Sequence, residues 1–385
     1  PIWHKEIEDI IVLKNNKGTE DNRVRKLDYS IQISKLFYER FINDEEITLF
    51  SPHEVPELYE AWGSPEFDEL YKTAERKTSV SKQKVSAQTL FMDMLKERAE
   101  TGRIYIMNID HCNTHSSFKD RITMSNLCQE ITLPTDPIQH IDGEGEIALC
   151  ILSAINVGKV NHVDELEPLC ELAVRSLDEI IDHQLYPVKA AEISTKARRS
   201  LGIGYIGLAH YIAKNKLKYS DKGAWKLVDE LTEAFQFYLL KHSNVLAQEK
   251  GKNEMFDRTK YSDGILPIDT YKPEVDELVK RKLSYDWEWL RTQIKKHGLR
   301  HSTLSAQMPS ESSSVVSNAT NGIEPPRDYL SIKKSKKGTL KQIVPQYATL
   351  KNNYTLLWDM ASNEGYINIV AVMQKYFDQA ISGNW

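Results

Sequence analysis

The composition of this chain of 385 residues is that of an ordinary globular protein: 41% of the residues are hydrophobic, enough for a large core, and the formal net charge is −5. Such a charge gives no general reason to expect nucleic acid or an anionic membrane as a partner. No apolar run approaches the ~20 residues of a transmembrane span, and the start lacks a signal-peptide pattern, so we expect a cytoplasmic protein. The four cysteines are too few for a disulfide scaffold, so any disulfide is expected to be redox-active.

The first quarter of the chain is predicted to be mostly helical. Apolar residues at three- and four-residue spacing predict amphipathic helices over 7–15 and 24–42. A short strand is expected just before Ser51 and Pro52, an N-cap and N1 pair that would open a helix. A long helix is predicted over 85–102, with the final glycine as its end.

A β-rich run over 103–110 leads into a cluster of possible metal ligands, His111, Cys112 and His115. Imidazole and thiolate are the usual zinc ligands. No second close pair completes a set of four, so hydrogen bonding and packing at the strand end are favoured, and a metal site stays as the alternative.

The hexapeptide Ser-Asn-Leu-Cys-Gln-Glu carries three residue types suited to chemistry on one small ligand. Side chains two apart project to the same side of an extended backbone, so we expect Asn126, Cys128 and Glu130 to share a face. Leu127 and Gln129 would point away. An amide can orient a hydroxyl, a carboxylate can take its proton, and a thiol can donate a proton, attack, or exchange a hydrogen atom. A short polar strand with a small buried cysteine is the alternative.

Two further cysteines fall in regular elements. The apolar, β-branched run over 145–158 predicts a strand buried on both faces, with Cys150 in its middle. On local grounds this cysteine is a core residue. Cys170 lies in the strongly helical pattern over 163–181 and is expected in the core of that helix.

Three glycines, Gly202, Gly204 and Gly207, match the spacing G-x-G-x-x-G. A dinucleotide site needs a strand before this motif, and the preceding residues are polar and basic, so close packing of a helix on a sheet is favoured. Helical patterns follow over 221–251 and 287–296.

The second stretch with chemistry of its own is rich in serine. A β-like run over 302–308 is broken by Pro309, and serines then cluster ahead of a short helical pattern. Hydroxyls and free backbone N–H groups at a helix start can hold phosphate, which the helix dipole stabilises. An ordinary loop or N-cap is the alternative.

The last part of the chain is predicted to be a hairpin over 331–345 followed by helices over 347–360 and 367–382. The hairpin would have a basic turn, with Lys333, Lys334, Lys336 and Lys337 in solvent, and an acidic or nucleotide partner for this turn is the alternative. Strands and helices thus alternate along the chain, which predicts the α/β class.

Taken together, these motifs resemble the large (α) subunit of class I ribonucleotide reductase, the aerobic ribonucleoside-diphosphate reductase. SNLCQEITLPT resembles the finger loop that carries the active-site cysteine of that family. The likeness covers essentially the whole chain and extends to TGRIYIMNIDHCNTHSSF, GEIALCILSAINVG, GILPIDTYK, MPSESSSVVSNATNGIEPPR and QKYFDQAIS. The resemblance implies part of a ten-stranded α/β barrel made of two five-stranded halves, with the finger loop rising through its centre.

The resemblance also implies a role for each motif residue. A radical made by the metal cofactor of a separate small (β) subunit would pass to Cys128, whose thiyl would remove the 3′ hydrogen of a ribonucleoside diphosphate. Glu130 would take the 3′-hydroxyl proton, Asn126 would hold the ribose hydroxyls, and Cys150 with a partner cysteine would supply two electrons. The substrate diphosphate would lie on Ser310, Glu311, Ser312 and Ser313. Glu311 would contribute its backbone N–H, and Ser312 stands where the family has threonine.

By the same resemblance, residues 1–385 are expected to be only part of the catalytic barrel domain. The regulatory domain that binds ATP, dATP and other dNTPs, and the first barrel half with the partner cysteine, would precede them. The radical-relay tyrosines and the cysteine tail re-reduced by thioredoxin or glutaredoxin would follow. We therefore expect no cofactor bound directly on this chain and no activity of the chain alone.

Two other classes of function stay open from the sequence. The chain could be a non-catalytic assembly or interaction fragment that keeps the fold without the chemistry. It could instead be a metal-dependent hydrolase that uses His111, Cys112, His115 and a carboxylate.

Overall fold

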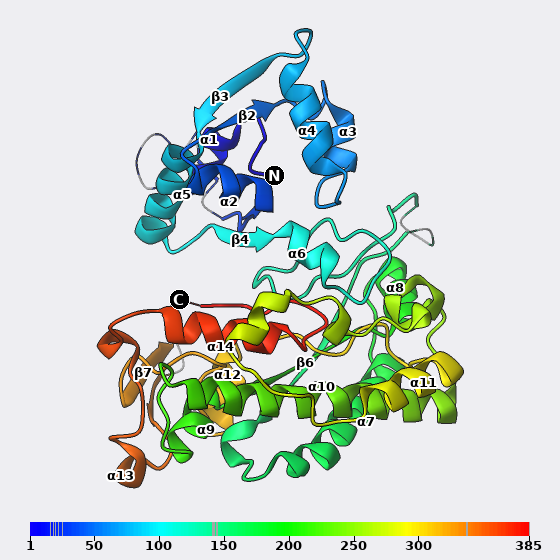
Figure 1. The fold of residues 1–385 in the computed structure, drawn as a ribbon, viewed down its shortest axis with the longest axis vertical. Helices are drawn as coiled ribbons and strands as arrows, with labels where there is room; N and C mark the ends of the chain where they lie inside the picture. Colours follow the sequence, from blue (N-terminus) through cyan, green and yellow to red (C-terminus); the bar gives the residue numbers. More distant parts are fainter. Residues whose placement is uncertain are drawn as a thin grey trace. The chain divides into compact units, whose positions relative to one another are not determined.

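The computed structural model describes all residues of the chain apart from 16, 18, 20, 22, 25, 141, 142, 144, 336, 337 and 385. Helices and strands follow one another along the chain (Figure 1), which confirms the α/β class. The chain forms two compact units. Unit 1 comprises Pro1–Ser116 and Arg121–Pro134, and unit 2 comprises Ser117–Asp120 and Thr135–Trp385.

Unit 1 contains two small sheets. β1 (Ser30–Ile33) pairs in parallel with β4 (Tyr105–Asn108), and β2 (Glu46–Phe50) pairs antiparallel with β3 (Lys82–Ser86). β2 and β4 confirm the strands predicted there. The helix predicted over 24–42 is confirmed only for its last part, Lys35–Ile42. The part before it is wrong, because β1 buries alternate side chains against the core with the period of a strand.

The helices of unit 1 are α1 (Ile7–Ile11), α2 (Lys35–Ile42), α3 (Pro56–Glu60), α4 (Phe67–Arg76), α5 (Ala87–Thr101) and α6 (Ile109–Thr114). α5 confirms its prediction: the Ser86 hydroxyl accepts a hydrogen bond in the first turn, and Gly102 ends the helix with φ of 64°. Ser51 and Pro52 do not open a helix. Pro52 begins a turn, and α3 begins later at a proline of its own.

Unit 2 is built on the parallel pair β5 (Ile151–Asn156) and β6 (Leu201–Ile206). Isolated parallel bridges join Ile203 to Ser305 and Gln307 to Ile381. The segment that contains Ser305 and Gln307 therefore lies beside β6, and the segment that contains Ile381 lies beside it on its other side. The prediction for β5 is wrong in part, because the strand begins after Cys150 and its Leu152 is 45% exposed.

The helices of unit 2 are α7 (Leu166–His183), α8 (Lys189–Arg198), α9 (Leu208–Lys214), α10 (Lys222–Lys250), α11 (Trp287–His297), α12 (Glu311–Val316), α13 (Tyr347–Leu350) and α14 (Glu364–Gln374). α10 packs against α7, α11 and α14 (Figure 1), and most of its side chains are buried. Cys170 on α7 is fully buried, which confirms its core role. α13 and α14 are both shorter than the helices predicted for this region.

Short 3-10 helices connect these elements: η2 (Val157–Lys159), η3 (Val163–Glu165), η4 (Phe256–Arg258), η5 (Lys260–Asp263), η6 (Pro267–Asp269), η7 (Pro273–Glu277) and η8 (Leu357–Asp359). No helix of the described chain is long and apolar enough to cross a membrane.

The glycine trio serves close packing. Gly202 and Gly204 lie inside β6, and Gly207 precedes α9 with φ of 80°. A Cβ at position 204 would lie 2.6 Å from the carbonyl oxygen of Ala306. Any larger residue would push the neighbouring segment away from β6. The close packing at Gly204 is therefore between neighbouring segments of the sheet, whereas the prediction was a helix packed on a sheet.

The predicted hairpin is confirmed by β7 (Leu330–Ser335) and β8 (Gly338–Ile343), which pair antiparallel. Lys336 and Lys337 of its turn lie outside the described residues. In total the described strands form four two-stranded sheets. A closed ten-stranded barrel is therefore not seen in the described part of the chain.

A buried carboxylate fixes the segment that follows α14. Asp378 is fully buried, and its side chain accepts hydrogen bonds from the N–H groups of Leu304 and Ser305 and from the Tyr261 hydroxyl. Because these donors would otherwise be buried without a partner, Asp378 ties the last segment of the chain to the sheet.

Replacing Asp378 with alanine is expected to lower the free energy of unfolding by about 3 kcal/mol or more, because several buried donors lose their acceptor. Urea denaturation of the chain measures this. Asp263→Ala is the matched control, since the Asp263 side chain is 55% exposed and pairs with Lys119. Equal stability of the two variants would contradict the role given to Asp378.

Candidate functional site

The segment that carries the N-x-C-x-E motif is a tight turn. The Gln129 N–H donates to the Asn126 carbonyl at 3.2 Å, and Gln129 has φ of 71°, in the left-handed region. The extended backbone predicted for this segment is therefore wrong. Asn126 closes the turn: its N–H donates to the Ile131 carbonyl at 3.3 Å, and its side-chain oxygen accepts from the Ile131 N–H at 3.1 Å.

Ser125 and Gln129, to which the sequence analysis gave no role in the site, hold this turn. The Gln129 side chain, predicted to point away, instead donates to the Asn126 carbonyl at 2.9 Å and accepts from the Ser125 hydroxyl at 2.8 Å. Leu127, by contrast, is half exposed as expected. The turn thus has its own hydrogen-bond network, whose only sequence signal is a run of short polar side chains.

The turn brings the three motif residues together. Glu130 is 2% exposed, and its Oε2 has no hydrogen-bond partner among the described residues. Burial raises the pKa of Glu130, and a hydrogen bond from Asn126 offsets part of that rise. Cys128 is half-buried, and both burial and the negative charge of Glu130 raise the pKa of its thiol.

These pKa directions decide what the site can do chemically. A thiol with a raised pKa keeps its hydrogen at neutral pH and is a poor thiolate nucleophile. A buried carboxylate oxygen without a partner can accept a proton from a bound hydroxyl. The turn therefore suits transfer of a hydrogen atom from or to Cys128, with Glu130 as the base.

The other predicted residues belong to unit 2. Cys150 is half-buried and lies immediately before β5. None of the four cysteines of the chain, all of which are described, forms a disulfide.

The serine-rich stretch forms the start of α12, as predicted. Ser310 is its N-cap residue, and the Ser310 hydroxyl is buried without a hydrogen-bond partner in the described chain. Glu311, Ser312 and Ser313 are exposed in the first turn of the helix. A cavity of about 550 Å³ lies beside α12, lined by residues that include Glu311 and by the β7–β8 hairpin.

The possible metal ligands lie on and just after α6. Burial raises the pKa of the Cys112 thiol to about 12, and the negative charge of Asp110 adds to this rise, so the thiolate that binds zinc is disfavoured. No three His, Cys, Asp or Glu side chains of the described residues come together in a way that could hold a metal ion. The arrangement gives no support to the hydrolase alternative.

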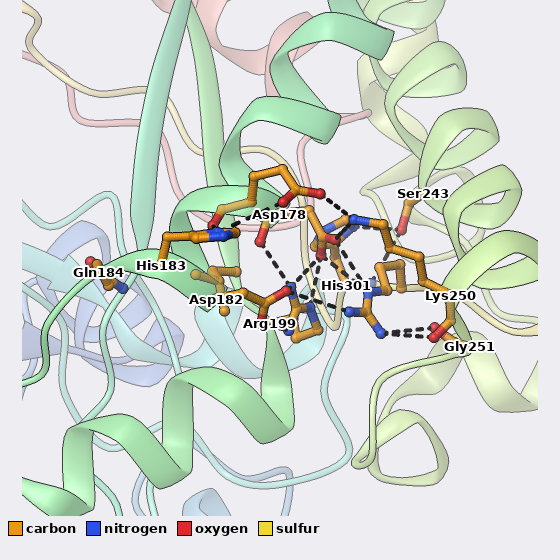
Figure 2. A network of polar contacts seen from close by, with 12 residues as sticks. Asp178, Asp182, His183, Gln184, Arg199, Ser243, Lys250, Gly251 and His301 are labelled. Carbon is orange, nitrogen blue, oxygen red and sulfur yellow. Dashed lines mark hydrogen bonds and ion pairs between the residues drawn. The ribbon is translucent and has the colours of Figure 1, made fainter.

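A polar network in unit 2 has the residue types of a hydrolytic triad (Figure 2). The Ser243 hydroxyl lies 2.9 Å from Nδ1 of His301, whose Nε2 lies 3.2 Å from a carboxylate oxygen of Asp178. All three residues are fully buried, and Arg199 and Arg300 also contact the Asp178 carboxylate. A nucleophile must reach its substrate, so this network ties α7 and α10 together and is not a catalytic site.

The whole chain, residues 1–385, matches the family model described as "Ribonucleotide reductase, barrel domain". It is 57% identical to the ribonucleoside-diphosphate reductase subunit alpha of Haemophilus influenzae and 55% identical to the ribonucleoside-diphosphate reductase 1 subunit alpha of Escherichia coli. It is 43% identical to the corresponding subunit alpha of Enterobacteria phage T4. Each alignment covers 100% of this chain, but the chain spans only 51–52% of these relatives.

The coupling between Glu130 and Cys128 can be tested directly. Glu130→Gln removes the negative charge beside the thiol, so the pKa of Cys128 falls and its alkylation by iodoacetamide at pH 8 is expected to speed up by about threefold. Peptide mass spectrometry across a pH series measures this rate. Glu100→Gln, an exposed carboxylate of the same unit, should change nothing, and an equal rate in both variants would contradict the coupling.

Proposed function

The chain belongs to the ribonucleotide reductase barrel-domain family, and from this we propose that it is part of the catalytic barrel of a ribonucleoside-diphosphate reductase large subunit. Its reaction would be the reduction of ribonucleoside diphosphates to 2′-deoxyribonucleoside diphosphates. One observation carries the proposal: a single turn joins an amide, a protonated thiol and a buried carboxylate oxygen without a partner.

Each residue of the turn has one task in the proposed reaction. The metal cofactor of a small (β) subunit would supply the radical. The Cys128 thiyl then removes the 3′ hydrogen of the ribose, so that an S–H bond forms as the C–H bond breaks. Glu130 takes the proton of the 3′-hydroxyl, and the 2′-hydroxyl leaves as water while Asn126 hydrogen-bonds the ribose hydroxyls. Cys150 and a partner cysteine give two electrons and two protons and become a disulfide, one proton leaving in the water and the other bonding to C2′. Cys128 then returns its hydrogen atom to C3′, and Glu130 returns its proton to the 3′-oxygen.

The substrate diphosphate is assigned to the start of α12. Ser312 and Ser313 are exposed in its first turn, where free backbone N–H groups and the helix dipole favour an anion. The buried hydroxyl of Ser310, which has no partner among the described residues, supports a ligand there. The Glu311 carboxylate would repel phosphate, and its backbone N–H donates to the Pro309 carbonyl at 2.9 Å, so this N–H would have to exchange that partner to bind the diphosphate.

The proposed reaction needs more polypeptide than this chain. The relatives are about twice as long, and the proposed partners include the remaining segments of the large subunit, which would complete a ten-stranded barrel around the finger loop. Those segments would also bind the allosteric nucleotides ATP, dATP and other dNTPs. In the cytoplasm, thioredoxin or glutaredoxin would re-reduce the disulfide.

We expect the chain mixed with small subunit, substrate and dithiol to form no deoxynucleotide, because the thiol that pairs with Cys150 belongs to another segment. Adding polypeptides that carry the remaining family segments should give turnover, measured as deoxynucleotide by chromatography. Turnover by the chain alone would contradict the assignment of the cysteines.

Within that complete complex, Cys128→Ser is the decisive variant. Serine is nearly isosteric but holds its hydrogen too tightly for thiyl chemistry, so nucleotide binding should persist while product formation is lost. Cys170→Ser is the control, since Cys170 lies in the core far along the sequence from the motif and should retain turnover in a folded protein. Appreciable product from Cys128→Ser would refute the mechanism.

A further inference from the structure

The segment that carries the N-x-C-x-E motif is connected at both ends to unit 2. Arg121–Pro134 is grouped with unit 1, whereas Ser117–Asp120 before it and the chain from Thr135 after it belong to unit 2. Each end carries a carboxylate, Asp120 on one side and Asp136 on the other. The position of the motif thus depends on what holds these two ends.

One guanidinium contacts both carboxylates. Nε of Arg258 lies 2.7 Å from Oδ2 of Asp120, and its two Nη atoms donate to the two carboxylate oxygens of Asp136 at 2.8 and 2.9 Å. The planar fork of an arginine has a fixed shape, so these contacts set the spacing between the two ends.

Arg258 is itself held against the first end through the backbone. The Lys119 N–H donates to the Arg258 carbonyl at 3.0 Å, and the Lys260 N–H donates to the Ser117 carbonyl at 2.7 Å. Residues 117–119 and 258–260 thus pair as antiparallel strands do. The guanidinium therefore reaches Asp136 from a fixed base.

A second arginine closes these contacts into a ring. Arg198, which is 2% exposed, donates to both carboxylate oxygens of Glu146 at 2.7 and 2.8 Å and to Asp120 at 3.1 Å. Glu146 in turn accepts from the Asp136 N–H at 2.8 Å, and its own N–H donates to the Asp136 carbonyl at 3.0 Å. The ring runs from Asp120 through Arg258, Asp136, Glu146 and Arg198 back to Asp120.

We propose that Arg258 is a positioning residue that holds the two ends of the motif segment at a fixed spacing and so fixes the shape of the turn that carries Cys128. This inference rests on the proposed function, because the reacting role of Cys128 is part of it. Arg258 would touch no reacting atom. It acts through Asp120 and Asp136.

Arg258 contributes to the stability of the ring, but both partners of its pair with Asp136 reach solvent. The Arg258 side chain is 37% exposed and that of Asp136 is 48% exposed, so solvent partly screens the attraction between them. The hydrogen bonds from Arg258 hold the pKa of Asp136 below its usual range, so the pair stays charged at neutral pH. A displacement of about 1 Å can nevertheless slow a reaction about 10²-fold, so a weak contact that sets geometry can matter greatly for turnover.

The first experiment tests whether Arg258 holds the motif segment, and it needs no enzymatic turnover. In the chain alone, Arg258→Gln should raise the alkylation rate of Cys128 by about fivefold or more, because the segment opens more often when its ends are released. Peptide mass spectrometry after timed exposure to iodoacetamide gives the rate.

Arg175→Gln is the matched control. Arg175 has the same contact pattern, with Nε 2.8 Å from Glu171 and its two Nη atoms 2.7 and 2.8 Å from Glu249, and its side chain is 35% exposed. It ties α7 to α10 and does not contact the motif segment. In Arg175→Gln, Cys128 should be alkylated as fast as in the unmodified chain. Equal alkylation rates in Arg258→Gln and Arg175→Gln would overturn the proposal.

The second experiment uses the complete reductase complex. Arg258→Gln should lower kcat by about tenfold or more with little change in KM, since substrate binding is intact and only the reacting geometry is disturbed. Arg258→Lys keeps the charge without the fork and should recover only part of kcat. Faster alkylation combined with an unchanged kcat would overturn the positioning role.

If Arg258→Gln does not fold, Asp136→Asn removes the same bridge at its more exposed end, with the same results expected in both experiments. If the unmodified complex gives no turnover, the proposed function fails, and the alkylation rates still decide whether Arg258 holds the segment.

Discussion

The pair of hydrogen bonds between Asn126 and Ile131 is the constraint on which the site depends. They close a turn that buries Glu130 and keeps Cys128 beside it. The negative charge of Glu130 and its burial then work in one direction, since both keep the thiol protonated. A site that needed a thiolate nucleophile would have a cation at this point, so the electrostatics favour hydrogen-atom chemistry.

The shape of this turn also depends on what holds the two ends of the motif segment. Its ends meet a ring of two arginines and three carboxylates in unit 2, and two members of that ring, Arg198 and Glu146, are almost fully buried. Buried ion pairs contribute less to stability than their number suggests, but each partner restricts where the others can lie. We infer that the ring adds little to the stability of the protein and mainly fixes the geometry at the two ends of the motif segment.

Residue types singled out Asn126, Cys128 and Glu130 but did not predict the shape of their segment. The extended backbone assumed for them was wrong, because the left-handed φ of Gln129 and the hydrogen bonds to Ile131 cannot be predicted from alternation. The helix predicted over 24–42 is wrong in its first part for a similar reason: β1 is a strand because of its partner β4, far along the chain. Arg258 could not be found from sequence, since it lies 122 residues from Asp136.

The most direct test of the account is the rate of 3′ hydrogen abstraction in the complete complex with Glu130→Gln. This rate is measured in single turnover by comparing 3′-deuterated with unlabelled ribonucleoside diphosphate. The account predicts that abstraction slows by about 10²-fold or more while nucleotide binding changes little, because glutamine keeps the shape of the turn but cannot accept the proton. An unchanged rate would contradict the claim that the turn unites Cys128 with its base.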